Sequence, residues 1–124
     1  MSDPYRRNRT FYQDVSGSLS VGAGTDDTTL KASKTNYTIY LQKAHIQITG
    51  ASAGKTWQFT DVADVQLTGP FPTDTDGSHY DMDFGPEGVP LTEASGLQLD
   101  VSAAGAAGWV SWEAYLKPTT VFKV

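Results

Sequence analysis

The sequence predicts an all-β domain of seven or eight strands, built as a two-sheet sandwich or a barrel. Nearly every apolar cluster alternates with polar residues at a period of two, which is the period of a strand and not of a helix. The 124 residues include 12 Gly and 6 Pro, which separate these clusters as turns do. This length fits one hydrophobic core, so we expect a single domain that folds without a metal or a disulfide.

The first half of the chain contains the longest expected strand. Residues 15–21 predict a first strand with a bend at its glycine, and residues 36–49 are rich in the Tyr, Ile and Thr that favour strands. The parity of the alternation changes within the long strand, so we expect a bulge or twist near residues 43–45. A turn at residues 50–54 leads to a strand at residues 56–60, and we expect these two strands to form a hairpin.

The second half predicts shorter strands. Alternation indicates strands at residues 65–67, 80–84 and 97–101, and Gly-Pro pairs end the first two. Residues 109–116 form another strand, which Pro118 ends. The last four residues, 121–124, could add a final short strand.

Aromatic residues occupy both faces of the strand at residues 109–116. The core face should carry Val110, Trp112, Ala114 and Leu116. Trp109 and Tyr115 are left on the opposite face, and we expect Trp109 to be exposed because it follows a loop of Gly and Ala. An exposed Trp marks either a platform for a ligand or a contact with another subunit.

No catalytic motif emerges from the sequence. The segment Gly50-x-x-x-Gly54-Lys55-Thr56 is one residue short of a nucleotide-binding loop, and it precedes a strand pattern where that loop needs a helix. The two histidines, His45 and His79, lack a second ligand at metal-binding spacing, and the chain has no Cys. We therefore expect no enzyme activity, no cofactor and no metal centre.

Acidic residues are dense around the loop from Asp74 to Asp83. Calcium prefers oxygen ligands, which this region could supply from Asp74, Asp76, Asp81 and Asp83, with Asp61 and Asp64 upstream. Their spacing does not match a helix-loop-helix calcium loop, and a solvated strand face plus an Asp-Gly turn explains the pattern better. Whether this loop binds a cation stays open at the level of sequence.

The net charge of −5 is unevenly distributed, because residues 1–10 carry three Arg and one Asp. We expect residues 1–14 to form an N-terminal arm and residues 15–124 to form the β-sandwich domain. The acidic domain would be repelled by phosphate backbones, so no nucleic-acid binding is expected. No apolar run has the length of a membrane span, so no membrane partner is expected either.

The arm is expected to become ordered only against a partner. Its arginines would pair with acidic groups and its aromatic residues would pack into a groove. With the exposed tryptophan, the expected partner-binding residues are Arg6, Arg7, Arg9, Phe11, Tyr12 and Trp109.

Several segments resemble the small β-sandwich proteins found in virions of tailed bacteriophages. The similarity lies in Tyr37–Thr49 followed by Trp57–Phe59, in Gly88–Leu91 and Gly96–Leu99, and in the Gly/Ala turn before Trp109 with the Tyr-bearing strand after it. The resemblance implies a jelly-roll-like fold and a structural role. It also implies a place in the virion, which would assemble in the host cytoplasm. Residues 1–35 match nothing in that group.

Two functions of different classes remain open. The first is a non-enzymatic head decoration (cement) protein that forms a homotrimer and binds the major capsid protein or another virion protein. The alternative is a carbohydrate- or receptor-binding module of a phage tail, which would use Trp109, Tyr115 and the loop at residues 74–83. The sequence does not distinguish head from tail.

Overall fold

The computed structural model describes residues 12–118, and this part of the chain contains ten β-strands and no helix. The strands are β1 (Gln13–Asp14), β2 (Gly17–Val21), β3 (Thr28–Lys31), β4 (Tyr37–Gly50), β5 (Thr56–Asp61), β6 (Phe71–Pro72), β7 (His79–Asp83), β8 (Val89–Pro90), β9 (Leu97–Val101) and β10 (Ala107–Pro118). No helix that could cross a membrane is found among these residues.

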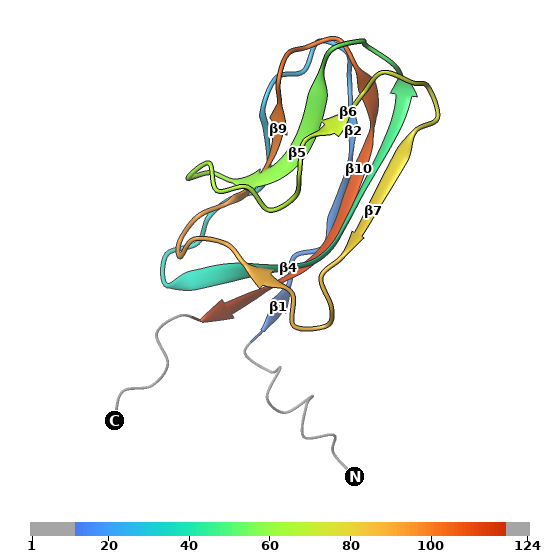
Figure 1. Ribbon diagram of the computed structural model, residues 1–124. Helices are drawn as coiled ribbons and strands as arrows, with labels where there is room; N and C mark the ends of the chain where they lie inside the picture. The colour runs from blue at the N-terminus through green and yellow to red at the C-terminus, as the bar shows by residue number, and fades with distance from the viewer. Residues whose placement is uncertain (1–11, 119–124) are drawn as a thin grey trace, which may run out of the picture.

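The strands form two antiparallel sheets that pack against each other (Figure 1). Sheet A has the order β1 or β2, β10, β4, and then β7 or β8, while sheet B has the order β3, β9, β5, β6. Both β1 and β2 pair with β10, and both β7 and β8 pair with β4. The ten strands of the described residues occupy eight positions, which confirms the predicted two-sheet sandwich. The strands β1, β3, β6 and β8 were not predicted.

The order of the strands is that of a jelly roll. Early strands pair with late ones in a nested series, β2 with β10, β3 with β9, β4 with β7, and β5 with β6. Two further pairings, β10 with β4 and β9 with β5, close the sheets. This nested pairing across two sheets is the topology of a jelly roll, so the expected jelly-roll-like fold is confirmed.

The longest strand contains the expected bulge. Glu113 of β10 pairs with Lys43, whereas the next residue of β10 pairs with Leu41, so Gln42 is the extra residue of β4. The bulge lies one residue before the predicted segment. It lets both Leu41 and Ala44 face the core despite the change of parity between them.

The first strand is interrupted at residues 15–16 and not at Gly17. Ser16 occupies the gap, where its hydroxyl donates to Asp14 Oδ1 and accepts from the amide of Ala114. Gly17 is required for space, because a Cβ there would lie 2.8 Å from the ring of Trp112.

A second irregularity occurs in the pairing of β10 with β4, near the top of Figure 1. Ala107 pairs with Gly50 and Gly108 with Ile48, so the register shifts by one residue. A Cβ on Gly108 would lie 2.0 Å from the carbonyl oxygen of Gln47, so no larger residue fits without moving the backbone.

The core lies between the two sheets. The predicted core face of β10 is confirmed, since the following residues are buried: Val110, Trp112, Ala114 and Leu116. Trp57 and Phe59 of β5 are fully buried on the opposite sheet. The indole nitrogen of Trp112 donates to the carbonyl of Val15 at 2.9 Å, which satisfies its polar atom inside the core.

The expected hairpin between residues 36–49 and 56–60 is wrong. β4 lies in sheet A and β5 in sheet B, so the turn at residues 50–54 carries the chain from one sheet to the other. The amide of Ser52 donates to the carbonyl of Thr73, which holds this crossing in place. A hairpin and a crossing have the same alternation and the same turn residues, so the pattern could not separate them. A strand does follow Lys55, as expected for a turn that is not a phosphate-binding loop.

The expected strand at residues 65–67 is also wrong. This segment makes only a single bridge, between Thr60 and Gln66, and the amide of Leu67 donates to the carbonyl of Phe59. It borders β5 without forming a regular ladder. The expected strand at residues 121–124 lies outside the described residues.

Candidate functional site

The outer face of sheet A gathers chemically active side chains from three strands. Alternate residues of β10 point into the core, so the intervening ones point outward. The register places them in rows across β10, β4 and β7: Trp109–Gln47–His79, Ser111–His45–Asp81 and Glu113–Lys43–Asp83.

A groove of about 470 Å³ crosses this face, and we call it the central groove. Its polar lining consists of Lys43, His45, Asp81, Asp83, Ser111 and Glu113. A second hollow of about 280 Å³ adjoins it, because Glu113 lines both. This hollow also includes Tyr12, Asp14 and Tyr115, so we call it the tyrosine hollow.

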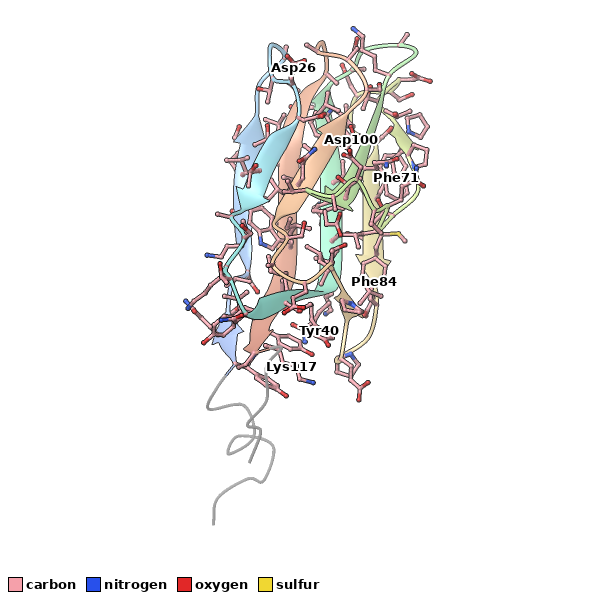
Figure 2. All side chains as sticks on the ribbon, turned by 90° about the vertical axis from the view of Figure 1, so that its left-hand side faces the viewer. Asp26, Tyr40, Phe71, Phe84, Asp100 and Lys117 are labelled. Carbon is pink, nitrogen blue, oxygen red and sulfur yellow. The ribbon has the colours of Figure 1, made fainter. Side chains whose placement is uncertain are left out.

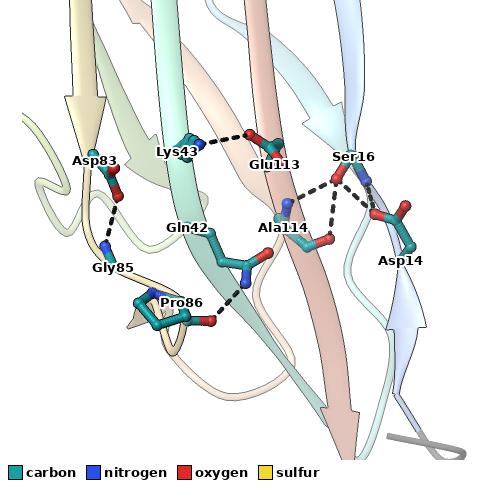
Figure 3. A network of polar contacts seen from close by, with 9 residues as sticks. All are labelled: Asp14, Ser16, Gln42, Lys43, Asp83, Gly85, Pro86, Glu113 and Ala114. Carbon is teal, nitrogen blue, oxygen red and sulfur yellow. Dashed lines mark hydrogen bonds and ion pairs between the residues drawn. The ribbon is translucent and has the colours of Figure 1, made fainter. Parts of the chain in front are cut away.

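The charged groups of the central groove are paired but accessible. Lys43 Nζ lies 3.6 Å from Glu113 Oε2, and His45 Nδ1 contacts Asp81 Oδ1 (Figure 3 shows the first pair). The hydrogen bond to His45 is the main cause that lowers the pKa of Asp81 below its ordinary value, so this carboxylate is ionised at neutral pH. Asp83 accepts a hydrogen bond from the amide of Gly85 at 2.9 Å, also seen in Figure 3.

The middle row has the residue types of a hydrolytic triad. Ser111, His45 and Asp81 lie side by side on three neighbouring strands. Within residues 12–118 no hydrogen bond joins Ser111 to His45, whose Nδ1 contacts Asp81 Oδ1. The row offers hydrogen-bonding groups for binding.

Three tyrosines stack at one end of the outer face. Tyr115 lies between Tyr12 and Tyr40, with ring centroids 5.3 and 5.2 Å apart and interplanar angles of 16° and 5°. The Tyr115 hydroxyl donates to the carbonyl of Glu87 at 2.7 Å. Since neighbouring rings cover both faces of Tyr115, it does not present a free platform to a sugar, contrary to what the alternative function requires of it.

Trp109 lies toward the other end of the same face. It is 50% exposed, which confirms the expectation of an exposed aromatic residue at this position. Its cross-strand neighbours on the two sides are Gln47 and Ser20. A large exposed ring with polar neighbours, one row from the central groove, suits a binding contact, which stays a prediction.

The other expected partner-binding residues divide into two groups. Tyr12 stacks on Tyr115 of its own chain, and residues 13–14 pair with β10, so this part of the expected arm contacts the sheet. The remaining residues lie outside the described part of the chain: Arg6, Arg7, Arg9 and Phe11.

The acidic residues considered for calcium are separated in the structure. Asp74 and Asp76 accept hydrogen bonds from the amides of Gly54 and Ala51, so they cap the crossing turn. Asp81 and Asp83 lie on the outer face of sheet A. Among residues 12–118, no three His, Cys, Asp or Glu side chains gather closely enough to hold a metal ion.

Asp61 has a structural environment. It is fully buried, and its carboxylate accepts hydrogen bonds from the hydroxyl and amide of Thr92 and from the amide of Val65. Burial raises the pKa of Asp61, but these bonds, led by the Thr92 hydroxyl, outweigh that effect and hold the pKa below its ordinary value. The buried charge therefore ties β5 to two loops.

The central groove could not be predicted from the sequence. Its residues lie far apart in the chain, and only strand pairing brings Ser111, His45 and Asp81 together. The one available signal was their position on the polar side of alternating strands. No protein-family model matches the chain, and no curated protein is significantly similar to it.

Proposed function

We propose that the chain is a non-enzymatic structural protein of a virion, a head decoration protein that binds and stabilises the capsid shell as a trimer. The observation that carries the proposal is the outer face of sheet A, where an exposed Trp109 and a charged groove are free to contact another molecule. The jelly roll is a fold of viral capsid domains and of lectins, and the segments quoted above resemble phage virion proteins.

The position of the chain ends supports assembly. Gln13 pairs with Leu116, so β1 begins where β10 ends, and both lie at one end of the sandwich (Figure 1). The tyrosine stack lies at that end, where Lys117 Nζ is 5.8 and 5.5 Å from the ring centroids of Tyr12 and Tyr40. Both terminal segments therefore start from a single region, from which they could contact a shell together.

Deletion of residues 2–10 tests the proposal. Because this segment precedes the described sheet, its deletion should leave the melting temperature of the isolated, unassembled domain nearly unchanged. It should lose binding to purified expanded capsid shells, measured by co-sedimentation, while the full chain binds saturably and sizes as a trimer by light scattering. Unimpaired shell binding by the truncated protein, or a full chain that stays monomeric and never binds shells, would refute the proposal.

A carbohydrate- or receptor-binding module is the second candidate. The central groove favours it, because Ser111, His45 and the carboxylates Asp81 and Asp83 can form hydrogen bonds to sugar hydroxyls beside Trp109. Retention on a polysaccharide column, lost in Trp109→Ala with an unchanged circular-dichroism spectrum, would favour this candidate. Tyr115→Phe serves as the control, because the hydroxyl that it removes already donates to the carbonyl of Glu87 and the ring stays between its neighbours.

A further inference from the structure

We propose that residues 1–11 of one copy of the chain bind in the central groove of a second copy, with the arginines of the segment paired to the carboxylates of the groove. The inference rests on the proposed assembly as a trimer and names the contact that holds the trimer together. It assigns the central groove an occupant, the N-terminal segment of a neighbouring copy.

Charge complementarity is the first argument. The central groove holds three carboxylates, Asp81, Asp83 and Glu113, against the single ammonium of Lys43, and the adjoining tyrosine hollow adds Asp14. Residues 1–11 contain three Arg and one Asp. Arginine is suited to this role because its planar guanidinium can bind a carboxylate through two parallel hydrogen bonds.

The carboxylates are charged and reachable. The hydroxyl and amide of Ser16 lower the pKa of Asp14, and the hydrogen bond to His45 lowers that of Asp81. The side chains of Asp81 and Glu113 are 68% and 58% exposed, so each retains oxygen lone pairs for an incoming donor. A cationic segment would therefore meet negative charge along the central groove and the tyrosine hollow.

The direction of β1 indicates a second copy and not the same one. β1 runs antiparallel to β10, with Asp14 opposite Tyr115 and Gln13 opposite Leu116. Followed toward the N-terminus, β1 runs toward the end of β10 and away from the rows of Glu113 and Ser111. To reach its own groove the segment would have to reverse direction, whereas a segment that continues outward leaves the domain toward a neighbour.

The segment is long enough for this contact. Eleven extended residues span at most about 40 Å, which exceeds the diameter of about 30 Å of a small domain. The stack of Tyr12 on Tyr115 fixes the position of the first described residue after the segment. The three arginines lie within six residues of that point, close enough to contact a groove that packs beside the tyrosine end.

Two charge-reversed full-length proteins test the inference. The arm variant carries Arg6→Glu, Arg7→Glu and Arg9→Glu, and the groove variant carries Asp81→Lys and Glu113→Lys. Like charges would then face each other within each variant, so each alone should assemble at least about tenfold more weakly in sedimentation velocity. A single chain that carries both sets of changes should recover assembly, because each acidic arm then meets a basic groove. An equimolar mixture of the two variants should recover assembly only in part, because a ring of three copies leaves one of its three contacts between like charges.

The matched control carries Asp26→Lys and Glu93→Lys, two exposed acidic positions in loops away from the groove; Asp26 lies at the opposite end of the sandwich from Tyr40 and Lys117 (Figure 2). It should assemble like the unmodified chain. Circular dichroism should show that all variants are folded, and assembly of the unmodified chain should weaken with added salt.

Each contrary outcome has a distinct meaning. Variants that assemble as well as the unmodified chain, or a chain carrying both sets of changes that assembles as weakly as either variant alone, would overturn the inference. If the variants remain trimers but no longer bind capsid shells, the segment binds the shell: the inference then fails and the proposed function stands. A full chain that binds shells only as a monomer would overturn the inference and the proposed trimer. The proposed binding to the capsid shell would then stand.

Discussion

The two sheets share one core but differ on their outer sides. On sheet A, residues of β4 and β10 alternate between buried and more exposed positions. One face of this sheet therefore packs in the core, and the other carries the central groove. On sheet B, β5 is buried along almost its whole length, including Gln58, Thr60 and Asp61. Polar groups on sheet A are free to contact a partner, whereas those around Asp61 bind loops of their own chain.

This difference suggests that the two sheets have separate roles, with binding groups on sheet A and stabilising polar groups on sheet B. Asp81 and Asp61 are both strand carboxylates, yet the first is exposed and pairs with a single imidazole, while the second is buried under several donors. A buried charge without its partners is costly, and an exposed one is not. We therefore expect changes on sheet B to affect folding and changes on sheet A to affect binding.

Replacement of Asp61 should have the largest effect. Asp61→Ala leaves the donors of Thr92 and Val65 without an acceptor in a buried site, so we expect a loss of about 2–4 kcal/mol in the free energy of unfolding, measured with urea. Asp81→Ala is the control on sheet A and should leave the free energy of unfolding nearly unchanged, because this side chain is exposed. Equal losses would remove the distinction between the two sheets.

The same carboxylate should contribute to acid sensitivity. Its pKa is lowered in the folded state, so its stabilising contribution is complete above the unfolded value of about 3.9 and is lost as the pH falls through the folded pKa. The stability of Asp61→Asn should consequently fall less steeply below pH 4 than that of the unmodified chain. Parallel curves from urea titrations at several pH values would contradict this prediction.

Replacement of Gly108, near the start of β10 where sheet A meets a loop, should cause the next largest loss of stability. Gly108→Ala places a methyl group against the carbonyl of Gln47, and the backbone shift should cost about 1–3 kcal/mol. Ser111→Ala, three residues along the same strand and pointing outward, should change stability by less than about 0.5 kcal/mol. Thermal unfolding of both variants makes the comparison.

Asp100 should respond in the opposite direction from Asp61, although both lie on sheet B. Burial is the main cause that raises the pKa of Asp100, followed by the charge of Asp27 and a hydrogen bond to it. The charged form is therefore disfavoured in the folded state, and Asp100→Asn should raise the melting temperature at pH 7. The gain should disappear as the pH falls through the raised pKa; a destabilised variant at pH 7 would contradict the assignment.

The ion pair of the central groove should make the smallest contribution to the free energy of unfolding. Lys43 and Glu113 have side chains that are 56% and 58% exposed, so water and salt screen their attraction. A double-mutant cycle with Lys43→Ala and Glu113→Ala should give a coupling energy of no more than about 0.5 kcal/mol. A coupling of several kcal/mol would mean that sheet A also depends on its outer face for stability.

The link between the sheets shows where sequence patterns stop being informative. Phe71 of β6 stacks on Tyr80 of β7 at 4.6 Å, and the Tyr80 hydroxyl donates to the carbonyl of Pro72 (Phe71 is labelled in Figure 2). Tyr80 was expected on a half-buried strand, and it is there. Its partner across the two sheets could not be foreseen, because alternation identifies the face of a residue and not the residue opposite it.

The sequence by itself determined where most strands lie, which side of each strand is apolar, and that β4 must contain a bulge between Leu41 and Ile46. It also determined that Trp109 stands outside the core. These properties follow from local chemistry, since side chains alternate along any extended chain and a change of parity requires an extra residue.

Only the tertiary structure decided which strands are neighbours, and with that the separation of β4 from β5, the row of Ser111, His45 and Asp81, and the burial of Asp61. The physical reason is that strands pair through backbone amides and carbonyls, which every residue carries in nearly the same form. Choosing among possible partners depends on packing the whole core at once, and that information is spread over the entire chain.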